Sequence, residues 1–273
     1  MPDTVLVVPC YNEANRLPQK GFREFAQAFP EVRLLFVDDG SQDETLGQLQ
    51  NLKQDLSAIS IVALPRNAGK AEAVRHGCLA AFELHPRCIG YWDADLATPL
   101  EVVHEFRAVF RRHPEVEIVF GARVRRMGSS IRRNPARHYL GRVFATAASL
   151  VLGLGVYDTQ CGAKLFRASE TMRETLRQPF LTRWLFDVEI LARLIRRAEQ
   201  APSPPIEELV YELPLPEWQD VPGSKIQPSD FPRAFFELMR IYRAYLASGT
   251  IDSRAQYRLA LSDRDSNHLA RAA

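Results

Sequence analysis

The chain has 273 residues and a formal net charge of +2, with 46% hydrophobic and 25% charged residues. This composition is ordinary for a globular protein with a sizeable core, and the near-neutral balance excludes a general electrostatic attraction to nucleic acid. The four cysteines, Cys10, Cys78, Cys88 and Cys161, lack the C-x-x-C spacing of a zinc site and any paired pattern, which disfavours a disulfide framework and fits a reducing compartment.

Apolar runs alternate with helical patterns over the first 120 residues. Strands are predicted at 4–9, 33–39, 59–64, 89–93 and 117–121, where continuous apolar residues indicate burial on both faces. Helices are predicted at 20–29, 42–55, 69–84 and 99–112. Ser41 with Glu44, and Thr98 with Pro99 and Glu101, are expected to start two of these helices as capping boxes. The repeated units predict an α/β fold with a mostly parallel sheet, whose carboxyl edge is where ligands bind.

The second half has a different pattern. Residues 118–157 contain seven arginines and no acidic residue, and they end in the apolar run 143–157, whose 15 residues fall short of the roughly 20 needed to span a bilayer. "YELPLPEW" is expected to form an extended edge segment. Further helices are predicted at 180–199, capped by Thr182, and at 231–247.

"DADLATP" places Asp93 and Asp95 directly after the fourth predicted strand. In extended backbone, residues two apart point to the same side, and two anions at about 4 Å repel by roughly 4 kcal/mol. A divalent cation, Mg²⁺ or Mn²⁺, turns this repulsion into attraction and takes its other ligands from phosphates and water. The pair is therefore predicted to hold a metal. The alternative is a helix cap with solvated carboxylates.

Polar residues also follow the first two strands and open the third helix. Asp38 and Asp39 in "VDDGS" lie where acidic residues bind a base or ribose in dinucleotide folds, or else form a capped turn with a left-handed Gly40. Tyr11 either covers the core or stacks on a nucleobase. There is no G-x-G-x-x-G after the first strand, and "NAGKAE" lacks the rest of a Walker loop, which disfavours an oxidoreductase and a P-loop ATPase. Lys70 in that segment is placed to meet a phosphate.

Three later motifs have both simple and functional interpretations. "DTQCGAKLF" and "VPGSK" are either surface loops or part of a site. In "FDVE", Asp187 either belongs to a site or forms an ordinary ion pair with Arg183, one helical turn earlier.

Together these motifs resemble the family-2 inverting glycosyltransferases of the GT-A fold, and among them the polyprenyl-phosphate sugar transferases of the dolichyl-phosphate glucosyltransferase branch. The resemblance covers roughly residues 4–226. It implies a Rossmann-like, mostly parallel sheet flanked by helices, with acceptor-side and membrane-interface helices toward the C-terminus. The matching stretches are "PCYNE", "VDDGSQDET", "RNAGKAEAVRHG", "DADLATP", "VFGARVR", "DTQCGAKLF", "RWLFDVEIL" and "PGSK".

The resemblance also implies roles for single residues. Asp93 and Asp95 would hold the metal on the donor diphosphate, and Asp187 would stand where related transferases place a base. The residues expected to face the acceptor phosphate or the donor are Arg123, Gln160 and Lys225. The residues expected to line the nucleotide are Pro9, Tyr11, Glu13, Asp38, Asp39, Lys70 and Asp93.

The implied reaction is metal-dependent, inverting transfer of a hexose from a nucleotide sugar to a polyprenyl or dolichyl phosphate, with glucose and UDP-glucose favoured. A phosphate monoester has a second pKa of about 6 and is already largely dianionic at neutral pH, so Asp187 is predicted to orient a group more than to take a proton. The open alternatives are GDP-mannose as donor, a soluble or polysaccharide acceptor, and an inactive sugar-nucleotide-binding protein.

The same resemblance suggests how the chain is organised. Residues 1–122 are expected to form the nucleotide-sugar half and residues 123–247 the acceptor half of one domain, with a charged, flexible tail at 248–273. Many lipid-phosphate transferases end in transmembrane helices, whereas none is predicted here, and there is no signal-peptide pattern. We therefore expect a cytoplasmic protein held peripherally on an anionic membrane by its arginine-rich, apolar segment. Alternatively, the apolar part of that segment forms a buried helix, and the arginine-rich part before it is exposed to solvent.

Overall fold

The computed structural model describes residues 2–54, 56–132, 135–200, 204–221 and 230–247. The strands in these residues are β1 (Thr4–Cys10), β2 (Val32–Asp38), β3 (Ile59–Ala63), β4 (Cys88–Trp92), β5 (Ile118–Ala122), β6 (Ser130–Arg132), β7 (Ala163–Arg167), β8 (Val210–Pro214) and β9 (Glu217–Gln219). The helices are α1 (Gln19–Ala28), α2 (Thr45–Gln54), α3 (Lys70–Phe82), η1 (Leu100–Val102), α4 (Val103–Arg112), α5 (Pro135–Leu152), α6 (Glu170–Arg177), α7 (Phe186–Gln200), α8 (Ile206–Leu209), α9 (Asp230–Ile241) and η2 (Tyr242–Leu246).

Seven strands form one sheet in the order β3-β2-β1-β4-β7-β5-β8. Strands β1 to β4 pair in parallel, as do β5 and β8, while β7 runs antiparallel to both of its neighbours. The predicted mostly parallel α/β sheet is therefore confirmed. From β1 the chain moves outward through β2 and β3 and then returns to place β4 on the other side. The strand order reverses between β1 and β4, which is where open α/β sheets bind ligands.

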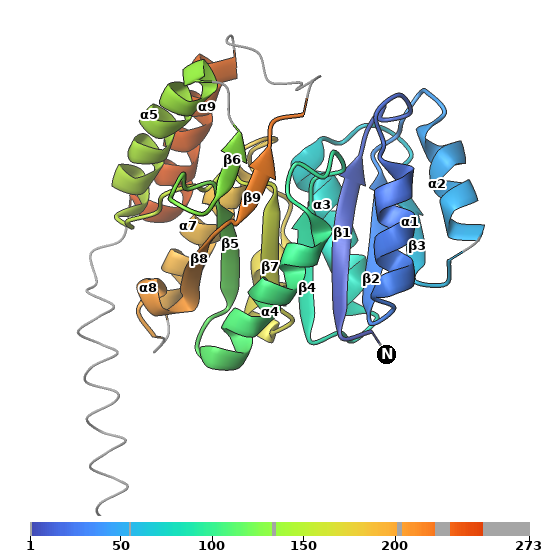
Figure 1. The fold of residues 1–273 in the computed structure, drawn as a ribbon. Helices are drawn as coiled ribbons and strands as arrows, with labels where there is room; N and C mark the ends of the chain where they lie inside the picture. The colour runs from blue at the N-terminus through green and yellow to red at the C-terminus, as the bar shows by residue number, and fades with distance from the viewer. Residues whose placement is uncertain (1, 55, 133–134, 201–203, 222–229, 248–273) are drawn as a thin grey trace, which may run out of the picture.

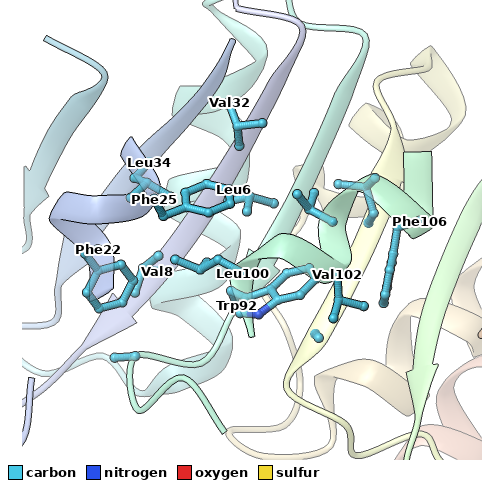
Figure 2. Close-up of a cluster of buried hydrophobic side chains, with 14 of the residues drawn as sticks. Leu6, Val8, Phe22, Phe25, Val32, Leu34, Trp92, Leu100, Val102 and Phe106 are labelled. Carbon is cyan, nitrogen blue, oxygen red and sulfur yellow. The ribbon is translucent and has the colours of Figure 1, made fainter. Parts of the chain in front are cut away.

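Helices cover both faces of this sheet (Figure 1). On one face, aromatic side chains of α1 and α4 pack with Trp92 of β4 into a continuous core (Figure 2). On the other face, α3 and α7 cover the same strands. Helix α3 approaches closely at Gly77, where a Cβ would lie 2.3 Å from Val7 Cγ1. Each large apolar side chain buried in this way contributes roughly 1.5–3 kcal/mol, so the core fixes the strand ends that carry the polar residues.

The two predicted capping boxes are wrong. The Ser41 hydroxyl accepts from the Asn12 amide at 3.0 Å, and α2 begins only at Thr45, whose amide donates to Asp43 Oδ1 at 3.0 Å. Near Thr98 a 3₁₀ turn begins after Pro99 without a side-chain cap. The Ser41 hydroxyl is taken by a neighbouring loop, a partner that the local sequence pattern could not reveal.

The predicted helix 180–199 begins later than expected, at Phe186. Thr182 does not cap it; its hydroxyl donates instead to the buried Glu189 at 3.2 Å. Glu189 also accepts from the amides of Leu181 and Thr182. The segment before α7 is therefore a loop that is held onto the helix by one carboxylate.

The C-terminal half adds two neighbouring helices, α5 and α9, at one end of the sheet (Figure 1). The rings of Phe144 and Phe235 join them, with centroids 6.5 Å apart. The predicted extended edge is confirmed, since β8 is the last strand of the sheet. Within the described ranges, none of the helices combines the length and the apolar character needed to cross a bilayer. The tail predicted at 248–273 lies outside the described residues.

Candidate active site

Three neighbouring strands bring most of the predicted residues to one edge of the sheet. Tyr11 follows β1, Asp38 ends β2 and Asp93 follows β4. Cys10 and Asp38 are register partners, and the Asp39 amide donates to the Cys10 carbonyl at 2.8 Å. Because β2, β1 and β4 lie side by side, these side chains gather at the point where the strand order reverses.

The two carboxylates after β2 differ in what they contact. Asp39 accepts from the amides of Ala68 and Gly69 at 2.7 and 2.9 Å, so it binds the start of α3. Burial raises the pKa of Asp39, although these amides oppose the shift. Asp38 accepts from the Ser41 amide at 3.3 Å through Oδ2, while its buried Oδ1 has no hydrogen-bond partner among the described residues. Asp38 is thus the better candidate to meet a base or ribose.

The turn between these carboxylates and α2 has the predicted conformation. Gly40 has a φ of 66°, and a Cβ there would lie 2.5 Å from the Arg66 backbone. A left-handed backbone and this close approach both require glycine. Pro9 and Tyr11, the other predicted nucleotide residues of this edge, are partly exposed.

Glu13 is buried and its carboxylate pairs with the Arg16 guanidinium, one contact measuring 2.8 Å. This bond raises the pKa of Arg16, and Asp95 and Asp93 add to the effect. Glu13 therefore contributes indirectly, by holding a cation close to the two aspartates. Arg16 was missed by sequence reasoning, although it lies in the segment that follows "PCYNE".

Asp93 is fixed from two sides. Its amide donates to the Gly162 carbonyl at 2.8 Å, and a Cβ on Gly162 would lie 2.0 Å from Asp93 Oδ2. On the other side Lys70 Nζ lies 2.5 Å from Asp93 Oδ1. Burial alone would lower the pKa of Lys70, but the carboxylates of Asp93, Asp187 and Asp95 outweigh it and raise the pKa. Lys70 therefore stays protonated beside Asp93.

Asp95 does not follow Asp93 in extended backbone, as the sequence had suggested. The chain turns, with the Leu96 amide donating to the Asp93 carbonyl at 3.2 Å and Leu96 at a φ of 51°. The two carboxylates still interact: burial raises the pKa of Asp95, and the charge of Asp93 raises it further. The predicted extended backbone is wrong, but the two like charges still repel each other.

The residues present fit a hard divalent ion that is shared with a ligand. Among the described residues, no group of three or more histidine, cysteine or acidic side chains could hold a metal by itself. Asp93 and Asp95 together supply two carboxylates whose mutual repulsion a cation would relieve. Mg²⁺ or Mn²⁺ typically takes one or two carboxylates and completes its shell from phosphates and water.

Across the edge, the loop before β7 carries Asp158 and Gln160. Asp158 accepts from Arg123 Nε and Nη2 at 2.7 and 2.8 Å, and the Arg123 guanidinium lies 5.3 Å from the centre of the Trp218 ring. Burial would lower the pKa of Arg123, but Asp158 raises it more. The charge of Arg123 is thus already paired. Gln160 is partly exposed and its amide lies 3.5 Å from the Thr159 hydroxyl.

Asp187 belongs to a buried polar cluster and not to a surface ion pair. Its Oδ1 accepts from the Tyr91 hydroxyl at 2.5 Å and lies 3.2 Å from Lys164 Nζ. Lys164 also donates to the carbonyls of Thr159 and Cys161 at 2.9 and 2.6 Å. Burial raises the pKa of Asp187 despite the opposing charge of Lys164. The alternative pairing with Arg183 is wrong.

Arg183 lies elsewhere, at the start of α3. Its Nη2 donates to Asn67 Oδ1 at 2.8 Å, and its Nε would lie 2.8 Å from a Cβ on Gly69. Sequence reasoning missed Asp158, Lys164 and Arg183 as contributors, although all three lie inside or beside the quoted motifs. Lys225, predicted to face the phosphates, lies outside the described residues.

Comparisons with known proteins show the family of the chain. The Glycosyl transferase family 2 profile matches residues 5–171. A dolichyl-phosphate beta-glucosyltransferase of Trichomonas vaginalis is 31% identical over 86% of this chain and 72% of its own length. The Homo sapiens dolichyl-phosphate beta-glucosyltransferase is 30% identical, covering 82% of this chain and 69% of its own.

Solved structures share the fold. Glucosyl-3-phosphoglycerate synthase from Mycobacterium tuberculosis, in complex with UDP, superposes with a TM-score of 0.60 at 17% identity, covering 89% of this chain and 80% of its own. At this identity the likeness concerns the fold alone, and it agrees with the predicted GT-A architecture. The chain is a glycosyltransferase, and it belongs to glycosyl transferase family 2.

Proposed function

We propose that the protein transfers glucose from UDP-glucose to a dolichyl or polyprenyl phosphate, with a divalent metal and with inversion at the anomeric carbon. The names of the dolichyl-phosphate beta-glucosyltransferases that it resembles support the sugar and the acceptor. The observation that carries the proposal is the meeting of Asp38, Lys70, Asp93 and Asp95 at the reversal of strand order. That arrangement suits a nucleotide whose diphosphate shares a cation with two carboxylates.

The donor would lie across the ends of β2, β1 and β4. Asp38, whose buried Oδ1 has no partner in the described part of the chain, would accept a hydrogen bond from the base or the ribose, and Tyr11 would cover the base. Asp93 and Asp95 would hold the metal, which supplies charge neutralisation of the leaving nucleoside diphosphate. Lys70 and Arg16 would add positive charge where negative charge grows during transfer.

The acceptor would approach from the loop that carries Asp158 and Gln160. Its phosphate oxygen is already a good nucleophile because the monoester is largely dianionic at neutral pH. Asp187 is 4% exposed and is held by Tyr91 and Lys164. This burial supports a role in orienting the site and not in proton removal. Arg123, paired with Asp158, would position the loop more than bind phosphate directly.

A lipid acceptor requires contact with a membrane, and α5 and α9 offer a surface for it. The exposed apolar residues of this surface, which we term the α5/α9 surface, are Tyr139, Val143, Leu150, Phe235, Phe236 and Met239. On each helix they are spaced so that they share one side. Exposed arginines accompany them on α9 and η2: Arg233, Arg240 and Arg243. Apolar side chains flanked by arginine suit an anionic bilayer surface.

Both interpretations of the arginine-rich, apolar segment receive support. Phe144, Ala148 and Leu152 of α5 are buried, as a core helix requires, while Leu150 of the same helix is 79% exposed. Helix α5 is also tied to the acceptor loop, because Arg142 donates to the Tyr157 carbonyl at 2.8 Å. The cytoplasmic, peripheral location stays a prediction.

The test offers radiolabelled UDP-glucose, UDP-GlcNAc and GDP-mannose with a short polyprenyl phosphate, in Mg²⁺ or in EDTA. We expect glucose in the extracted lipid only with UDP-glucose and Mg²⁺, and no product from Asp95→Ala. Mannose in the lipid would replace the donor assignment. Transfer only to a soluble acceptor would overturn the lipid assignment, and donor binding without any transfer or hydrolysis would identify a catalytically inactive protein.

A further inference from the structure

Lys70 contacts Oδ1 of Asp93, the carboxylate oxygen that would lie farther from a Cβ on Gly162, at 2.8 Å against 2.0 Å for Oδ2. Nζ lies 2.5 Å from Oδ1, as an ion pair and not as an aligned hydrogen bond. Lys70 is the first residue of α3, and its side chain is 29% exposed. Part of the Lys70 side chain is therefore open to solvent beside Asp93.

A metal ion held by Asp93 and Asp95 would share the Asp93 carboxylate with Lys70. A divalent ion there would lie close to the Lys70 ammonium, since both would contact the same carboxylate group. At such a distance a doubly positive ion and an ammonium repel strongly. Lys70 and a metal at Asp93 are therefore competitors as long as no negative charge is added.

Asp93 has no freedom to resolve this competition by turning away. Gly162 packs on its other oxygen so closely that a Cβ would lie 2.0 Å from Oδ2, and the Asp93 amide is bound to the Gly162 carbonyl. Lys70, with a flexible four-carbon chain, is the partner that can move. The neighbouring cations have other attachments, Arg16 to Glu13 and Arg183 to Asn67.

We propose that Lys70 couples metal binding to donor binding. It keeps a divalent ion off Asp93 until a nucleoside diphosphate arrives, and then moves its ion pair from the carboxylate to a phosphate. The inference rests on the metal and diphosphate of the proposed function, and it adds an order: ion and nucleotide bind as a unit. By thermodynamic linkage, the nucleotide tightens metal binding by the same factor as the metal tightens nucleotide binding.

The test measures Mn²⁺ binding by the loss of the free-ion electron paramagnetic resonance signal, with and without UDP. For the wild-type chain we expect UDP to tighten Mn²⁺ binding by about tenfold or more, within the usual range of coupling between sites. In Lys70→Met, Mn²⁺ alone should bind about tenfold more tightly than in wild type, and the effect of UDP should shrink. Lys70→Arg should keep the coupling. Lys20→Met, which removes an exposed lysine of α1, is the matched control and should behave as wild type.

The outcomes separate this inference from the proposed function. Equal binding of Mn²⁺ alone by wild type and Lys70→Met would overturn the coupling, while UDP-dependent Mn²⁺ binding in wild type would leave the metal site standing. If folded wild type, checked by circular dichroism, bound no Mn²⁺ even with UDP, the coupling and the metal assignment would both fail. Asp93→Asn should lose Mn²⁺ binding under both conditions.

Discussion

Lys164 and Asp187 form a buried ion pair between β7 and α7, with Nζ 3.2 Å from Oδ1. Lys164 has no exposed side-chain surface, so removing it leaves an uncompensated buried carboxylate. We expect Lys164→Met to lower the free energy of unfolding by about 3–5 kcal/mol, measured by urea denaturation. Lys164→Met combined with Asp187→Leu should recover much of that loss. A double variant as unstable as the single one would mean that the bonds from Lys164 to backbone carbonyls dominate.

Asp187→Asn tests the role of this carboxylate in the reaction. The asparagine Oδ1 can still accept from the Tyr91 hydroxyl. The side chain no longer carries the negative charge that balances the charge of Lys164. We expect turnover to fall about tenfold, equal to about 1.4 kcal/mol, with UDP affinity kept in a calorimetric titration. Complete loss of turnover with binding intact would instead assign proton removal to Asp187.

Gly162→Ala tests the packing against Asp93. The new Cβ would lie 2.0 Å from Asp93 Oδ2 and must displace the carboxylate. Because small misplacements of a binding group can cost about a hundredfold in rate, we expect a loss of that order in sugar transfer. Gly155→Ala is the matched control, since a Cβ there meets nothing within 4 Å. Equal rates in the two variants would show that Asp93 adjusts freely.

Charge on the α5/α9 surface should weaken membrane binding. Phe236 is 78% exposed and Leu150 79%, so Phe236→Glu with Leu150→Glu should leave the fold intact and add repulsion from anionic lipid. We expect the double variant to stay at the bottom in flotation with phosphatidylserine vesicles, while wild type rises. Gln54→Glu, which adds negative charge at the exposed end of α2, should rise like wild type. Flotation of the double variant would contradict the assignment.

The buried cysteines should lower the stability of the folded chain at alkaline pH. Burial raises the pKa of Cys78 to about 12 and that of Cys161 to about 11. As the pH rises above the ordinary thiol value of 9.0, the unfolded chain ionises first, so the free energy of unfolding should fall progressively toward pH 11. Native protein should resist iodoacetamide at pH 8, measured by intact mass, and become reactive in urea. Rapid labelling of folded protein would show that the thiols are exposed.

The five strands of the first half were predictable because each is a continuous apolar run bounded by turn residues. The first four pair in parallel as expected, whereas β5 pairs with β7 and β8. Strand β7 was missed for a physical reason. Lys164 interrupts its apolar pattern, and a lysine normally indicates solvent. Here the charge is compensated by Asp187, which lies 23 positions later in the chain and is brought back by α7. A local pattern carries no record of such a partner.

The site residues also divide into those that could be predicted from the sequence and those that could not. Asp38, Lys70, Asp93 and Asp95 were predicted because each follows a strand or opens a helix, and strand order alone brings such positions together. The partners of these residues were not predictable. Arg16 reaches the aspartates only through its pairing with Glu13, and Gly162 reaches Asp93 only because β7 pairs with β4. The type and position of a residue were enough to identify it as a candidate site residue. Its contacts depend on tertiary packing, which the sequence pattern does not show.

The antiparallel strand β7 has a consequence for engineering this chain. It is inserted between β4 and β5, and the loop before it forms one wall around Asp93. A graft that exchanged residues 123–247 for those of a relative would replace this wall too. It would also replace Lys164, which donates to the Tyr91 hydroxyl. Residues 1–122 and 123–247 are therefore not separable modules: a grafted second segment must bring an antiparallel strand that fits between β4 and β5.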